Sequence, residues 1–79
     1  MQNVTDKDFL KALGNHIRII RKNKHLTQLD VGVAMDNYAE QIGRIERGEL
    51  NVTICTLKKI AESLGISLSE LLKFEHDLK

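Results

Sequence analysis

The chain has 79 residues, a formal net charge of +1, one cysteine and no proline. This length predicts a single domain over residues 1–79, near the lower limit at which a hydrophobic core is stable without disulfides or metals. A lone Cys55 excludes an internal disulfide and lacks the paired Cys/His spacing of a zinc site, so stability has to come from aliphatic packing and, we expect, from self-association. No apolar run is long enough for a membrane span or a signal peptide, which indicates a cytoplasmic protein.

The charges are unevenly distributed along the chain. Residues 1–24 hold six Lys/Arg against two Asp, and residues 25–79 hold six Lys/Arg against nine Asp/Glu. A basic first segment permits a positively charged face without a basic pI. A solvated first helix explains the same pattern, so charge alone does not decide the function.

Four places carry the start signal of a helix: an apolar residue, then Thr or Ser as N-cap, then another apolar residue four positions after the cap. They are Val4-Thr5 with Phe9, Leu26-Thr27 with Val31, Val52-Thr53 with Leu57, and Ile66-Ser67 with Leu71. Three of the four also carry an acid at the third helical position, which completes a capping box and offsets the helix dipole: Asp8, Asp30 and Glu70.

In chain order, these caps and the apolar spacing predict five helices, at about 5–23, 27–35, 38–47, 53–64 and 67–75. The first helix has an apolar face made by Leu10, Leu13, Ile17 and Ile20, and we expect His25 at its C-cap. Gly65 is suited to a left-handed cap after the fourth helix. The predicted fold class is therefore all-α, a compact five-helix bundle.

The second and third predicted helices are separated by about three residues, too few for them to run antiparallel. They must cross at a steep angle, which is the helix-turn-helix geometry. A glycine inside a helix costs about 1 kcal/mol relative to alanine, so Gly32 indicates close packing where the two axes approach. The shared apolar side of the pair is expected to consist of Val31, Met35, Ile42 and Ile45.

Three groups of residues in register carry a family resemblance: Thr27-Gln28 with Val31-Gly32, then Ile42 with Arg44-Ile45-Glu46-Arg47-Gly48, then Asn51, Thr53-Ile54 and Thr56-Leu57. Over about residues 9–72 the chain resembles the helix-turn-helix family of phage repressors (Cro/cI, xenobiotic-response-element type), whose fold is the lambda-repressor-like DNA-binding domain. The chain departs from the family at the turn, where Asp36, Asn37 and Tyr38 replace glycine, an apolar residue and serine. Asn37 as N-cap with Glu40 reaching back is an alternative start for the third helix.

The resemblance implies that helix 38–47 is a recognition helix whose first turns reach base edges in the major groove. Arg44 is the best candidate for direct readout, by a bidentate pair with guanine, although a phosphate contact is the alternative. Glu40 either accepts from a cytosine amino group or, as we favour, serves the Asn37 cap. The candidate base contacts are Ala39, Glu40, Gln41, Gly43 and Arg44.

The resemblance also implies phosphate contacts and a structural ion pair. Gln28 resembles the family glutamine that touches phosphate and braces the recognition helix, and Arg21 with Glu46 resembles a partly buried salt bridge that fixes the helix angle. The candidate phosphate contacts are Gln28, Lys22, Lys24, Tyr38, Arg47, Asn51 and Thr53.

The expected function is sequence-specific binding of double-stranded DNA by a small homodimeric transcription regulator, on an inverted-repeat operator. Restriction-modification controller proteins and small phage repressors resemble the chain in size and plan. The candidate dimer residues are Leu50, Ile54, Leu72, Phe74 and Leu78. The rival hypothesis is a protein-interaction module, such as an antitoxin component or an adaptor, which the low net charge and the acids Glu40 and Glu49 near the presumed DNA face favour.

No catalytic constellation is recognised in the sequence, so we expect no enzyme activity. The three histidines, His16, His25 and His76, are too scattered to predict a metal site. No cofactor and no small-molecule ligand is implied.

Overall fold

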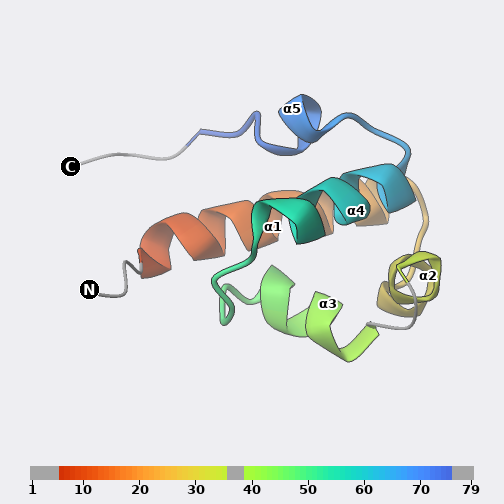
Figure 1. Cartoon of the computed structure of the whole chain (residues 1–79), viewed down its shortest axis with the longest axis horizontal. Coiled ribbons are helices and arrows are strands. Elements are labelled where there is room, and N and C mark those ends of the chain that lie inside the picture. Colours follow the sequence, from red (N-terminus) through yellow and green to blue (C-terminus); the bar gives the residue numbers. More distant parts are fainter. Residues whose placement is uncertain (1–5, 36–38, 76–79) are drawn as a thin grey trace.

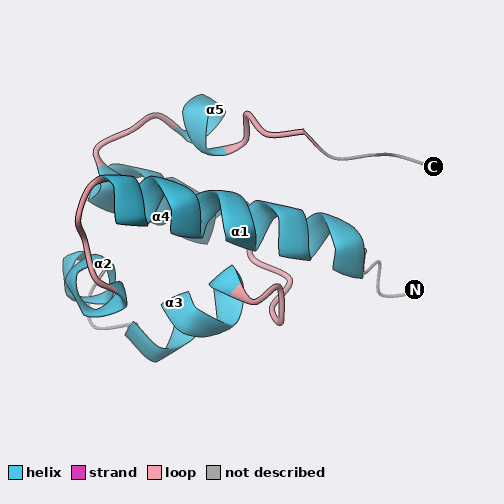
Figure 2. Ribbon diagram, turned by 180° about the vertical axis from the view of Figure 1, so that it is seen from behind, coloured by secondary structure: helices cyan, strands magenta, loops and turns pink. Residues whose placement is uncertain are grey.

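The computed structural model describes residues 6–35 and 39–75, and its secondary structure is entirely helical there. The helices are α1 (Lys7–Asn23), α2 (Gln28–Ala34), α3 (Ala39–Glu46), α4 (Ile54–Leu64) and α5 (Leu68–Leu71). In the view of Figure 1, α1 and α4 cross the middle of the molecule, α2 and α3 lie below them, and α5 lies above. Figure 2 shows the same arrangement from behind, with loops joining the helices. The predicted all-α fold with five helices is confirmed.

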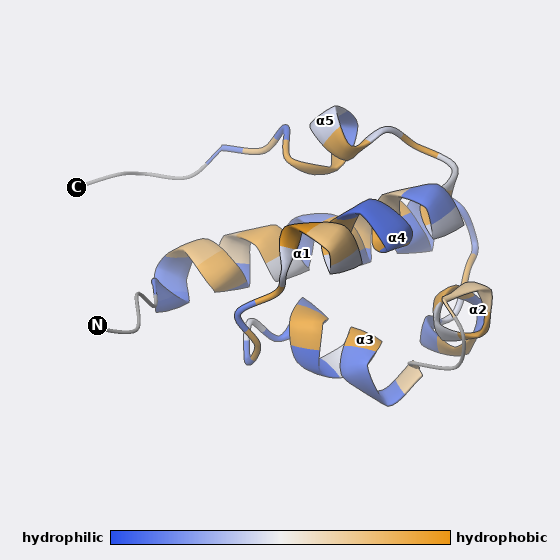
Figure 3. Cartoon of the chain, in the orientation of Figure 1, coloured by the Kyte–Doolittle hydropathy of each residue, from blue (hydrophilic) through white to orange (hydrophobic). Residues whose placement is uncertain are grey.

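The core lies between these three levels. Hydrophobic segments of α3 lie on the side that faces α1 and α4, and its hydrophilic segments lie on the outer side (Figure 3). The four residues predicted to form the shared side of α2 and α3 are all buried. The core residues are Leu13, Ile17, Val31, Met35, Ile42, Ile45, Leu57, Ile60, Ala61, Leu64 and Leu71.

Local capping explains where most of the helices begin. Thr27 and Ser67 form complete capping boxes with Asp30 and Glu70, as predicted. Thr53 caps α4 by accepting from the backbone N–H of Thr56. Side-chain oxygens thus satisfy N–H groups that lack a partner inside each helix.

The predicted start of α1 is wrong by one residue. The N-cap is Asp6, whose carboxylate accepts from the backbone N–H of Phe9 at 2.9 Å. Asp8 therefore stands at the second helical position instead of the third, where a capping box requires it. Thr5, the predicted cap, lies outside the described residues. Thr5 and Asp6 are both residue types that favour the N-cap position, and no spacing rule in the sequence distinguishes the two.

The last helix is shorter than predicted, because α5 ends at Leu71 and not near residue 75. The aromatic ring of Phe74 packs instead against α1, with ring centroids 5.6 Å from Phe9 and 5.3 Å from His16. His16 also lies 3.3 Å, through its Nε2, from the carbonyl oxygen of Glu70. These tertiary contacts replace the helical continuation.

Two glycines let helix backbones approach closely. A Cβ on Gly32 would overlap the backbone of Ala39, so α2 and the start of α3 meet there, as the sequence predicted. A Cβ on Gly14 would overlap the carbonyl groups of Ile45 and Glu46, so α1 passes directly over the end of α3. Both ends of α3 are therefore placed by contacts with bare backbone. The predicted C-cap of α1 is wrong by one residue: the C-cap is Lys24, and His25 directly follows it with a left-handed φ of 59°.

Candidate nucleic-acid interface

The outer side of α3, with the residues that border it, forms what we call the α3 surface: Gln28, Glu40, Gln41, Arg44, Arg47 and Glu49. Ile42, Ile45 and Glu46 point into the molecule and are buried, whereas Glu40, Gln41 and Arg44 are exposed. The Arg44 side chain is 48% exposed. The helix therefore presents its polar side outward along its length.

A buried ion pair fixes the angle of α3 against α1. The guanidinium of Arg21 donates from Nε to Glu46 Oε2 at 2.6 Å and from Nη2 to Glu46 Oε1 at 3.0 Å. Its Nη1 donates to the carbonyl oxygen of Leu26 at 2.8 Å. The hydrogen bond to Glu46 raises the pKa of Arg21 above its ordinary value. The pair is the one that the family resemblance implied.

Gln28 connects this pair to the α3 surface. Its Nε2 donates to Glu46 Oε1 at 3.1 Å, so Glu46 receives three charge-assisted or polar hydrogen bonds from two elements. Among the described residues, no buried side-chain nitrogen or oxygen lacks a hydrogen-bond partner. Gln28 is half-buried, and its amide is held at the edge of the surface and not free in solvent.

Gly43 was a candidate base contact, but it is buried in the structure. A Cβ there would lie 3.1 Å from Arg47 Nη1 and 3.2 Å from Gln28 Oε1. The ends of these two side chains thus both border the space that the glycine leaves over the α3 backbone. Gly43 provides this room and offers no side chain to a base.

Arg47 and Arg44 share one carboxylate, that of Glu49. Arg47 donates from Nε to Glu49 Oε2 at 2.8 Å and from Nη2 to Glu49 Oε1 at 3.4 Å. Arg44 Nε lies 3.7 Å from Glu49 Oε1. The hydrogen bond from Arg47 lowers the pKa of Glu49 below its ordinary value. This bridge was missed at the sequence level, where Glu49 counted only as a negative charge near the surface.

The loop after α3 and the first turns of α4 border the same surface. Gln41, Asn51, Thr53 and Thr56 line a hollow of about 170 Å³ between α3 and α4. A neighbouring hollow of about 380 Å³ is lined by Gln41 again, with Cys55, Thr56 and Lys59. The hydroxyl of Thr53 serves the α4 cap and donates to Thr56 Oγ1 at 2.9 Å. Three of the candidate contact residues therefore lie together at one edge of α3: Gln41, Asn51 and Thr53.

The remaining basic and turn candidates do not all join this surface. The pKa of Glu70 in α5 is lowered mainly by its hydrogen bond with the backbone of Ser67, and the charge of Lys24 makes a smaller contribution. The α5 helix lies on the opposite side of α1 and α4 from α3 (Figure 1). Lys22 is exposed in the last turn of α1. Ala39 is half-buried next to Gly32. Tyr38 and the proposed Asn37 cap lie outside the described residues.

The dimer candidates divide into two kinds. Ile54 and Leu72 are exposed, by 58% and 38%, and line one apolar hollow of about 380 Å³ with Phe9, which sequence reasoning had treated only as a helix staple. Leu50 and Phe74 are partly buried against the chain's own core. Leu78 lies outside the described residues.

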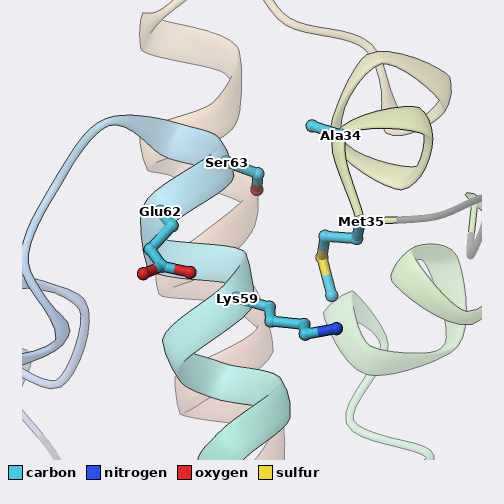
Figure 4. A pocket seen from close by; sticks show the side chains of 5 residues that line it. All are labelled: Ala34, Met35, Lys59, Glu62 and Ser63. Carbon is cyan, nitrogen blue, oxygen red and sulfur yellow. The ribbon is translucent and has the colours of Figure 1, made fainter.

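A separate hollow of about 260 Å³ lies between α2 and α4 and is lined by Ala34, Met35, Lys59, Glu62 and Ser63. Figure 4 shows Lys59 extending toward Met35 and α3, with Glu62 turned away from both. The hydroxyl of Ser63 donates to the carbonyl oxygen of Ile60 at 2.7 Å. Within residues 6–35 and 39–75, no cluster of three or more His, Cys, Asp or Glu has the arrangement of a metal site. None of the helices described there has the length and hydropathy of a membrane span.

An exposed polar helix, a preceding helix that crosses it at a bare glycine, and a buried ion pair that fixes its angle define a helix-turn-helix protein. The chain belongs to the helix-turn-helix family HTH_3, which matches residues 17–71.

The chain is similar to control protein C.MunI of Mycoplasma sp, with 39% identity over 65 residues, which are 81% of this chain and 88% of that protein. The uncharacterized HTH-type transcriptional regulator y4dJ of Sinorhizobium fredii is 34% identical over 64 residues, which are 81% of this chain and 83% of that protein. Among solved structures, the tetramer of the restriction-modification controller protein C.Esp1396I in complex with its natural 35-base-pair operator gives a TM-score of 0.78 at 28% identity. The match covers 86% of this chain and 90% of that one.

Proposed function

We propose that this protein is a small homodimeric transcription regulator that binds double-stranded DNA sequence-specifically, with α3 in the major groove. The observation that carries the proposal is the outward polar side of α3, with Arg44 exposed on it, while the Arg21–Glu46 pair fixes the angle of the helix. A rigid exposed helix of this kind fits the width of the major groove. Relatives named as a control protein and as a controller bound to its operator support the same function.

The proposed contacts follow from where the side chains lie. Arg44 reads a base, with Ala39, Glu40 and Gln41 beside it on the first turns of α3. Arg47 and the residues at the two edges of α3 contact phosphates: Gln28 on one side, and Asn51 and Thr53 on the other. Phosphate contacts supply affinity and register, whereas base contacts supply sequence preference.

The proposed dimer joins two copies at the apolar hollow of Phe9, Ile54 and Leu72. Figure 1 shows the start of α1 at the side of the molecule and α3 at its lower face, so two copies joined there can present both α3 helices on one side. Two such helices enter successive major grooves about 34 Å apart. The operator is then an inverted repeat.

Selection from random duplexes followed by footprinting tests the proposal. We expect one enriched inverted repeat, bound with an affinity that falls steeply as salt rises, because bound counterions are released from the DNA. Arg44→Ala should relax the sequence preference, whereas Arg47→Ala should weaken binding to all duplexes alike. If no duplex is enriched and binding does not respond to salt, the protein-interaction module is the better interpretation.

A further inference from the structure

The carboxylate of Glu49 occupies the donors that a DNA phosphate would need. Arg47 directs Nε and Nη2 at its two oxygens, at 2.8 Å and 3.4 Å. Arg44 directs its own Nε at one of them, at 3.7 Å. A carboxylate and a phosphate present the same pair of acceptor oxygens to a guanidinium fork. Each arginine can therefore serve one of the two anions at a time through these atoms.

We propose that Glu49 is an internal competitor for DNA phosphate, which holds Arg47, and more weakly Arg44, away from non-specific duplexes. The inference rests on the proposed function and deepens it by naming the residue that sets the affinity for DNA of any sequence. A DNA phosphate can bind these Arg47 donors only if it displaces the Glu49 carboxylate. The displaced carboxylate is then left unpaired beside the DNA. This exchange lowers the affinity for non-specific DNA, which lacks the base contacts that offset the loss at an operator.

Burial distinguishes the Arg47–Glu49 pair from the Arg21–Glu46 pair. The side chains of Arg47 and Glu49 are 59% and 47% exposed, whereas those of Arg21 and Glu46 are 9% and 2% exposed. An exposed pair is weakened by solvent and salt, so it can be exchanged when another anion arrives. The buried pair cannot be exchanged without exposing the core. Arg47 also lowers the pKa of Glu49, so the competing carboxylate is ionised at neutral pH.

The test measures binding of the full chain to a mixed-sequence duplex by fluorescence anisotropy, over a series of salt concentrations. We expect Glu49→Gln to tighten binding about two- to fivefold at low salt, the range that an exposed ion pair allows. The slope of log affinity against log salt should steepen by up to about one unit, because no released carboxylate takes up a cation. Glu62→Gln is the matched control, since it removes the same charge from an exposed glutamate that pairs with Lys58 in α4.

A second experiment, in a chain that lacks Arg47, distinguishes competition for Arg47 from simple charge repulsion between Glu49 and the DNA. In an Arg47→Ala chain, Glu49→Gln should lose most of its effect, because the donor for which the carboxylate competes is gone. An equal gain in that background, or an equal gain from Glu62→Gln, would overturn the inference and leave only net charge as the cause. A wild-type chain that binds DNA salt-dependently while Glu49→Gln changes nothing would overturn the inference alone. A wild-type chain that binds no duplex would overturn the proposed function with it.

Discussion

At the scale of single residues, the Glu46 side chain connects α3 to two other helices. It accepts from Arg21 in α1 and from Gln28 at the start of α2, while its own backbone lies against Gly14. The partners neutralise a carboxylate that is shut away from water. Breaking such a buried pair from one side leaves an uncompensated charge, which costs far more than the net value of the intact pair.

Glu46→Ala should therefore lower the free energy of unfolding by about 3–5 kcal/mol, enough to unfold much of a domain of this size at 37 °C. Thermal and urea unfolding followed by circular dichroism measure the loss. Glu62→Ala, an exposed glutamate, is the control and should change stability by no more than about 0.5 kcal/mol. An unchanged melting temperature for Glu46→Ala would contradict a stabilising role of the Arg21–Glu46 pair.

At the scale of helices, the capping patterns in the sequence predicted where most helices begin. The end of α5 depends on tertiary contacts and was not predicted. The caps at Thr27, Thr53 and Ser67 follow from a hydroxyl at the right spacing, which is a property of a few neighbouring residues. The early end of α5 could not be predicted in this way, because it depends on Phe74 finding Phe9 and His16 more than fifty residues earlier in the chain. Helix periodicity carries no information about that contact.

Gly14 is a second glycine inside a helix that marks close packing, and the sequence analysis predicted such packing only at Gly32. The cost of about 1 kcal/mol for glycine inside a helix pointed to Gly32 and applies equally to Gly14, which the structure places against the carbonyl groups of Ile45 and Glu46. Gly14→Ala should destabilise the protein by about 1–3 kcal/mol through overpacking, although alanine is the better helix former. The exposed neighbour Asn15 provides the control, since Asn15→Ala should be neutral or stabilising in the same denaturation experiment. Equal stability of Gly14→Ala and wild type would show that α1 and α3 can move apart freely.

The capping boxes make α2 and α5 sensitive to acid. The backbone N–H of Thr27 donates to Asp30 and lowers the pKa of this carboxyl below 3.8, and the backbone N–H of Ser67 does the same for Glu70 below 4.5. Because each pKa is lower in the folded state, the carboxylates stabilise the fold fully above their ordinary pKa and lose this effect as pH falls through the lowered one.

Wild type should therefore be more stable than Asp30→Asn near neutral pH, and the difference should shrink below about pH 4. Unfolding free energies from urea titrations at a series of pH values test this. Asp8→Asn, at the second helical position of α1, is a comparison without a capping box. A difference between wild type and Asp30→Asn that stays constant down to pH 2 would exclude the linkage.

At the scale of the whole molecule, motif spacing brought some candidate residues together and misplaced others. Gln28 and Arg44 lie at the edge and on the outside of α3 because the crossing of two helices fixes them there. Lys24 stands close to Arg21 in sequence, yet its charge also contributes to the lowered pKa of Glu70 in α5, after the larger effect of the hydrogen bond with Ser67. The bridge from Arg47 to Glu49 depends on the path of the loop after Gly48, which no helix period describes.

The apolar hollow lined by Phe9, Ile54 and Leu72 is the proposed dimer interface. Phe9, Ile54 and Leu72 come from α1, α4 and the segment after α5, and each is substantially exposed for a large hydrophobic side chain. A twofold dimer uses the same patch on both copies, so one substitution acts twice. Ile54→Glu should place two carboxylates in the proposed interface and raise the dimer dissociation constant at least about tenfold.

Sedimentation equilibrium measures this constant, and circular dichroism checks that the variant remains folded. Leu29→Glu is the control, because Leu29 is 60% exposed on α2 and takes no part in the hollow. The monomeric variant should also lose most of its preference for an inverted repeat over a single half-site, since only a dimer engages both halves at once. If Ile54→Glu dimerises as wild type does while Leu29→Glu does not, the copies meet on α2 instead, and the geometry proposed for the two α3 helices has to be abandoned.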